Sequence, residues 1–233
     1  MKLSTYIMCG AFVVGLVIAG LAAATSASSE IKKPRPLQLD GEMVDRSVPD
    51  GFSTIVFEQS ELSTRYKINN YQGLKVEQSD SVVVPVLRAS EPWLDILQVE
   101  LKGDTLKITA NPESMLEGYE CSSGSCGPVN IWNNDIWPIT VIVPQSTVLN
   151  TVASSTSSVQ LQHFDTPAIA VGTASRLVLY DCAIDSLVCS GTVDELKIDR
   201  STVKHLSIEG ASANFNVNTC DGSGIIESMS FNR

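Results

Sequence analysis

Apolar and polar positions alternate in short runs along residues 177–227, and these runs recur at a regular spacing. Their first residues lie 10, 9, 10, 9 and 10 positions apart, so two runs make a unit of 19 residues. Runs this short are typical of strands, and an internal period of this size is typical of solenoids. The six runs begin at Leu177, Leu187, Leu196, Leu206, Phe215 and Ile225.

This period makes particular residues equivalent. Leu177, Leu196 and Phe215 share one position of the unit, and Leu187, Leu206 and Ile225 share another. A small residue also recurs at Cys182, Ser201 and Cys220. The pattern therefore predicts an all-β fold: a single-stranded β-helix, or β-solenoid, whose coils of about 19 residues pair with their neighbours about 4.8 Å away.

Strand patterns also precede the coils, and we expect them to belong to the same continuous β-structure. Lys102-Gly103-Asp104 lies between two of them and predicts a hairpin turn. The expected domain covers residues 52–233, with an insert at 111–137 that has little periodicity. The predicted strands are Phe52–Glu58, Tyr66–Asn69, Leu74–Gln78, Ser81–Leu87, Leu97–Leu101, Thr105–Thr109 and Ile139–Val143.

The N-terminal residues 1–27 predict a signal peptide or an N-terminal membrane anchor. Residues 6–24 are an uncharged apolar run, and small residues at its end suit cleavage. The length of the run and the basic residues at 32–35 suit an anchor that is retained, so both alternatives stay open. A cleaved signal peptide and a retained anchor both predict that the folded part of the chain is exported. Its destination would be the periplasm, the outer-membrane surface or the extracellular space of a Gram-negative envelope. Residues 28–51 are predicted to be a linker.

The net charge of the chain narrows its possible partners. A net charge of −10 argues against nucleic acid as a partner, and it allows a membrane contact only through residues 6–24 if they are not cleaved.

Cys121 and Cys126 could close a small disulfide loop in an oxidising compartment, or they could be two free thiols. Cys182, Cys189 and Cys220 are expected to be small buried residues. No spacing supports a zinc site, and no cofactor is expected.

Several segments resemble the putative auto-transporter adhesin, head GIN domain family of exported bacterial proteins. They are Phe52–Glu58, Gly73–Asp80, Gly103–Ile108, Ile139–Pro144, the serine-rich Val152–Ser158 and the later coils, in this order. The resemblance covers roughly residues 52–233. It implies a β-solenoid at the cell envelope with a role in adhesion, and it offers no catalytic or ligand-binding residues to transfer.

Catalytic groups are sparse. Asp181 and Arg200 lie 19 positions apart, so they could stack as a pair, which we expect to be a solvated salt bridge. Together with Asp185 they are the only residues that could be nominated for an enzyme. His163 and His205 are expected at surface or corner positions, without a partner motif. No catalytic site is therefore predicted.

The insert holds the strongest candidate for a binding site. Aromatic faces beside amides and a carboxylate are suited to holding sugars and are frequent at protein interfaces. The alternative is that the tryptophans cover the core or cap an edge. The candidate ligand-binding residues are Tyr119, Trp132, Asn133, Asn134, Asp135 and Trp137.

Three functions follow in order of preference. The first is a non-enzymatic exported β-solenoid for adhesion or cell-envelope interaction, whose partner would be a glycan or an envelope or surface protein. The second is a structural or sensing module anchored at the membrane. The third is a carbohydrate-active enzyme of the β-helix type.

Overall fold

The computed structural model describes residues 37–59, 66–69, 73–116, 129–133, 137–154, 158–209, 215–219 and 223–232. All of them belong to one compact unit, Pro36–Arg233. Its elements are β1 (Leu37–Gln38), β2 (Met43–Ser47), β3 (Thr54–Gln59), β4 (Tyr66–Asn69), β5 (Gly73–Ser79), β6 (Val86–Ser90), α2 (Glu91–Ile96), β7 (Leu97–Lys102), β8 (Thr105–Ala110), the 3-10 helix Pro112–Leu116, β9 (Val129–Trp132), β10 (Ile139–Pro144), β11 (Thr151–Ser154), β12 (Ser158–Gln162), β13 (Asp165–Val171), β14 (Ala174–Tyr180), β15 (Ala183–Cys189), β16 (Val193–Asp199), β17 (Thr202–Glu209), β18 (Asn216–Thr219) and β19 (Ile225–Asn232).

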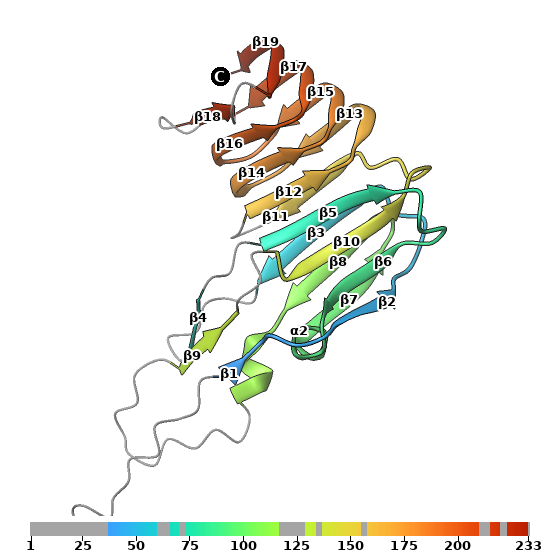
Figure 1. Cartoon of the computed structure of the whole chain (residues 1–233), viewed down its shortest axis with the longest axis vertical. Coiled ribbons are helices and arrows are strands. Elements are labelled where there is room, and N and C mark those ends of the chain that lie inside the picture. Colours follow the sequence, from blue (N-terminus) through green and yellow to red (C-terminus); the bar gives the residue numbers. More distant parts are fainter. Residues whose placement is uncertain are drawn as a thin grey trace, which may run out of the picture. The chain divides into compact units, whose positions relative to one another are not determined.

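The fold is all-β and is built on two large mixed sheets (Figure 1). Sheet I has the strand order β18-β16-β14-β12-β5-β10-β6-β2, and sheet II has the order β19-β17-β15-β13-β11-β3-β8-β7. A small sheet has the order β1-β9-β4. From β11 onward, successive strands alternate between sheets I and II, so each strand pairs in parallel with the strand two places along the chain.

The pairing register confirms the 19-residue spacing over the middle of the predicted coils. Leu177 pairs with Leu196, and Leu187 pairs with Leu206. In the last strands the predicted equivalences are wrong, because Leu196 pairs with Val217 instead of Phe215. Leu206 likewise pairs with Met229, whereas Ile225 pairs with Thr202.

These shifts of two and four residues follow from the geometry of a strand. Side chains alternate between the two faces, so an even shift keeps the apolar set on the inner face, whereas an odd shift would turn it outward. The shifts are therefore compatible with the apolar pattern, and that pattern could not exclude them.

The N-terminal strands follow a different pairing rule from the coils. β10 is parallel to β5 but antiparallel to β6, and β8 is parallel to β3 but antiparallel to β7. β2 is antiparallel to β6. The predicted single-stranded winding therefore does not describe this part of the chain. Each large sheet ends in antiparallel strands instead.

Most strands predicted ahead of the coils are confirmed to within one or two residues. The Lys102-Gly103-Asp104 turn joins the antiparallel β7 and β8, and Gly103 has a φ of +63°. The predicted strand Ser81–Leu87 is wrong over Ser81–Pro85, since β6 begins at Val86. Two strands, β1 and β2, lie within the predicted linker 28–51, and β9 lies within the predicted insert 111–137.

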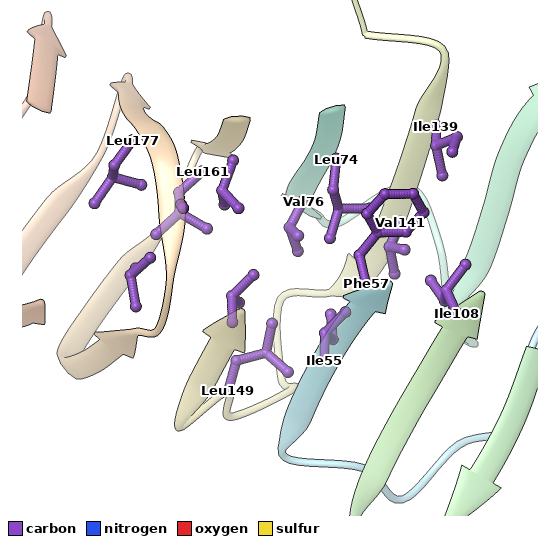
Figure 2. Packing of buried hydrophobic residues seen from close by; sticks show 14 of the residues in the cluster. Ile55, Phe57, Leu74, Val76, Ile108, Ile139, Val141, Leu149, Leu161 and Leu177 are labelled. Carbon is purple, nitrogen blue, oxygen red and sulfur yellow. The ribbon is translucent and has the colours of Figure 1, made fainter. Parts of the chain in front are cut away.

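The hydrophobic core lies between sheets I and II. Figure 2 shows Ile55 and Phe57 of β3 directed toward Leu74 and Val76 of β5, and all four are fully buried. β10 differs from the other strands because all six of its residues are buried, which means that both of its faces are covered. The core is continuous from the antiparallel end through the coils.

Candidate ligand-binding site

The predicted ligand-binding residues fall around β9, a short strand that pairs in parallel with β1 and β4. Ile131 is fully buried, whereas the side chain of its neighbour Trp132 is 43% exposed. Asn133 follows and is buried again, and Trp137 is partly buried. Tyr119, Asn134 and Asp135 lie outside the described residues, and so do Cys121 and Cys126 of the predicted disulfide.

A cavity of about 440 Å³ lies where the end of β9 meets the chain between β1 and β2. Its volume is in the range of small-molecule pockets. Described residues from the β1–β2 connection, from the start of α2 and from the end of β9 form its wall. They are Leu39, Asp40, Gly41, Met43, Ser90, Trp93, Asn133 and Pro138.

The short helix α2 supplies one side of the cavity. Ser90 occupies the N-cap position and Pro92 follows in the first turn, a position where the missing N–H of proline has no cost. The Ser90 hydroxyl makes no cap bond, and it donates instead to the backbone carbonyl of Leu39. This bond joins the start of α2 to the chain that follows β1.

A buried pair forms the floor of the cavity. Trp93 is 1% exposed, and its Nε1 donates to Oδ1 of Asn133 at 3.3 Å. Asn133 is equally buried, so the pair satisfies polar atoms that would otherwise be costly in the interior. The backbone N–H of Leu39 donates to the carbonyl of Trp132 at 2.9 Å, which fixes the two segments on either side.

The remaining lining residues are mostly apolar, and Asp40 is the charged one among them. Met43 is 40% exposed, and Asp40 is partly buried. Gly41 lies so close to α2 that a Cβ on it would be 3.1 Å from Cδ of Pro92. Apolar surface beside an amide and a carboxylate is suited to non-covalent binding of a small ligand with both apolar and hydroxyl faces.

The structure brings one of the predicted residues, Asn133, into the cavity. Trp132 and Trp137 are not among the described residues that line it, although Trp132 directly precedes Asn133 in the chain. The contribution of α2 was missed by sequence reasoning. The sequence does contain a signal for the start of this helix, because Ser90-Glu91-Pro92 is a combination that is typical of a helix N-terminus.

The predicted pair of Asp181 and Arg200 is confirmed at the turn between sheets I and II. Nη2 of Arg200 lies 2.9 Å from Oδ2 of Asp181, and the guanidinium carbon lies 4.2 Å from the centre of the Tyr180 ring. Nε2 of His163 lies 3.7 Å from the same carboxylate oxygen. His163, Asp181 and Arg200 all have φ between 47° and 60°. The three side chains are a third to a half exposed. Their ion pairs are therefore solvated and contribute little to the stability of the fold.

His205 is exposed, as predicted, and it contacts two hydroxyl groups on β19. Its Nδ1 lies 2.9 Å from Oγ of Ser228, and its Nε2 lies 3.4 Å from Oγ of Ser230. The Ser228 hydroxyl also lies 2.8 Å from the carbonyl of Lys204, to which it can donate. The carbonyl and the imidazole therefore compete for the single hydroxyl proton of Ser228.

The described residues contain no group of three or more histidine, cysteine, aspartate or glutamate residues placed to hold a metal ion. No helix among them has the length and apolar character needed to cross a membrane.

Comparison with known proteins gives only weak similarities. No protein-family model and no curated protein matches the chain, so the head GIN resemblance stays a prediction. A "putative adhesin" from Parabacteroides distasonis is 11% identical with a TM-score of 0.37, covering 84% of this chain and 79% of its own. A "putative lipid binding protein" from the same species is 14% identical with a TM-score of 0.31, covering 84% and 100%. A "putative cell adhesion protein" from Clostridium sporogenes is 11% identical with a TM-score of 0.29, covering 83% and 100%. Similarities at this level carry no conclusion about this chain.

Proposed function

We propose that this chain is an exported, non-enzymatic β-solenoid that binds a carbohydrate of a cell surface or envelope and so serves in adhesion. The observation that carries the proposal is the cavity of about 440 Å³ at the end of β9, with the exposed Trp132 directly beside one of its buried lining residues in the chain. The 19-residue register of β14 to β17 supports the solenoid. The apolar run at residues 6–24 supports export.

A sugar would use the two kinds of surface that the site offers. Its apolar ring face would pack against Met43 of the cavity wall, and the exposed Trp132, which does not line the cavity, would offer a further aromatic face. Its hydroxyl groups would donate to the Asp40 carboxylate, a charge-assisted bond that is stronger than a bond between neutral groups. The buried Trp93–Asn133 pair would hold the floor of the cavity in place.

The test is binding of the purified chain to a broad panel of glycans. We expect saturable binding that is weakened about tenfold by Asp40→Asn. The variant keeps an acceptor oxygen but loses its charge, which lowers the contribution of the hydrogen bond from about 1.5–3 to about 0.5–1.5 kcal/mol. Asp80→Asn is the matched control, since it makes the same change in charge at an exposed turn outside the cavity. Trp132→Ala is expected to weaken binding as well.

Three results would contradict the proposal. Equal affinity for the Asp40→Asn and Asp80→Asn variants would remove the cavity from the binding site. Cleavage of any glycan by the purified chain would contradict the non-enzymatic role. Absence of binding to every glycan in the panel would contradict the carbohydrate as ligand.

A further inference from the structure

The last strand of each large sheet leaves one side of its backbone unpaired, and both strands lie at the same end of the stack (Figure 1). β18 pairs with β16 and β19 pairs with β17, and neither has a second partner among the described strands. The free edge of β19 is eight residues long. An exposed edge of this length is a template for another strand.

The apolar core also continues to this end without a cover from the described residues. On β17, Leu206 and Ile208 are buried to 0% and 1% exposure. Their pairing partners on β19 are Met229 and Phe231, which are 39% and 59% exposed. Each strand from β11 to β17 is covered by the strand two places further along the chain, and no described strand covers β19 in this way. Pairing with a further strand would bury both side chains.

The charge at this end does not oppose contact between two copies. The whole chain has a net charge of −10, but Glu227 is the only charged residue in the described ranges 215–219 and 223–232. Glu227 also has a cation nearby. Asp185 chiefly, and Glu227 to a smaller extent, raise the pKa of Lys204. The described residues of this end therefore carry little charge, although the whole chain is acidic.

The opposite end of the stack differs in character. β2 and β7 are the last strands there, and both are antiparallel to their neighbours. Arg88 pairs with Asp45 of β2 at 2.6 Å, and Lys102 pairs with Glu100 of β7 at 2.7 Å. Charged edge strands disfavour pairing with another sheet. Contact between unlike ends would place apolar side chains against this charged edge.

We propose that the end formed by β18 and β19 docks a second copy of this chain in a two-fold dimer. β19 pairs antiparallel with β19 of the other copy, and β18 pairs with β18. Pairing like with like matches the two eight-residue strands and the two four-residue strands in length. A two-fold axis also closes the assembly after two copies, so both large sheets continue across the interface without growth into a filament.

Sedimentation of the full chain over a range of concentrations tests the proposal. We expect wild type to reach twice the monomer mass and Phe231→Lys to weaken dimerisation at least a hundredfold. Val148→Lys is the matched control, because Val148 is 67% exposed and lies outside this end. Circular dichroism checks that each variant is folded. A dimer that persists in Phe231→Lys overturns the proposal, and so does a wild-type series of ever larger species.

Hydrogen exchange on the wild-type protein gives a second readout that needs no variant. Backbone amides of β19 are expected to exchange more slowly at high protein concentration than at low concentration, while those of β2 and β7 are unchanged. Equal exchange of β19 at both concentrations overturns the proposal. A wild-type chain that stays monomeric at every concentration would also overturn it.

Discussion

At the scale of single residues, the two described cysteines behave as packing groups. Cys182 and Cys189 are buried free thiols on the inner side of the coils. Burial raises the pKa of Cys182 to about 11 and the pKa of Cys189 to about 12. The thiol of Cys182 also donates to the carbonyls of Leu161 and Tyr180 at 3.4 and 3.3 Å. Both groups are therefore held in the protonated, unreactive form.

This burial predicts a loss of stability at alkaline pH. Below pH 9 the thiols are protonated in both the folded and the unfolded chain. Above pH 9 the unfolded chain forms thiolates while the folded chain does not, so the free energy of unfolding falls as the pH rises toward the folded pKa values. Each thiol contributes about 1.4 kcal/mol per pH unit in this window.

Urea denaturation at pH 8 and at pH 10 measures this loss. The Cys182→Ala/Cys189→Ala double variant is the control, because its stability should fall less between the two pH values. An equal fall in both proteins would contradict the burial of the thiols.

The candidate site shows how far sequence reasoning reaches at this scale. Asn133 of the predicted insert lines the cavity, and ligand binding by the insert stays a prediction. Its partner Trp93 and the carboxylate of Asp40 are 40 and 93 positions away along the chain, respectively. Only the pairing of β1 with β9 and the placement of α2 bring them together. No local pattern reports such contacts, because they depend on tertiary structure.

At the scale of elements, the start of β5 depends on a glycine. Gly73 has a φ of +134°, and a Cβ on it would lie 2.0 Å from the backbone oxygen of Ser158 on the neighbouring β12. A substitution there is strained in the backbone and also collides with a rigid atom of the next strand. The close approach of β5 and β12 therefore excludes any side chain.

We expect Gly73→Ala to lower the free energy of unfolding by about 3 kcal/mol or more, since overpacking and backbone strain add. Gly103→Ala is the matched comparison. Gly103 also has a positive φ, but no heavy atom lies within 4 Å of an added Cβ, so we expect a loss of about 1–2 kcal/mol from strain alone. Thermal and urea unfolding of both variants measure the difference. Equal losses would contradict the role of the β5–β12 contact.

Strands were easier to predict than their pairing. Alternation located β8 because one of its faces is buried, and the mainly apolar run of β10 reflects burial on both faces. β7 also alternates in sequence, although Leu97 is its only buried residue. The same alternation could not decide between Phe215 and Val217 as the partner of Leu196, because both lie on the same face. It also could not show that β6 and β7 run antiparallel to their neighbours, since side-chain period is the same in both directions.

At the scale of the whole molecule, stability should be highest in the middle of the two large sheets. β10 is paired on both sides and buried on both faces, whereas four of the five residues of β2 are exposed. We expect native-state hydrogen exchange at low protein concentration to be slowest in β10 and fast in β2. Exchange of β2 amides as slow as that of β10 would contradict this order.

The change from antiparallel to parallel pairing within each large sheet has a consequence for how such a molecule can vary in evolution. The cavity lies at the antiparallel end, whereas β14 to β17 repeat the same contacts at a step of 19 residues. Duplication of one such unit within the gene would add a matched pair of strands and leave both ends intact. Each duplication would increase the distance between the cavity and the β18–β19 end by about 4.8 Å, a fixed increment on which selection could act.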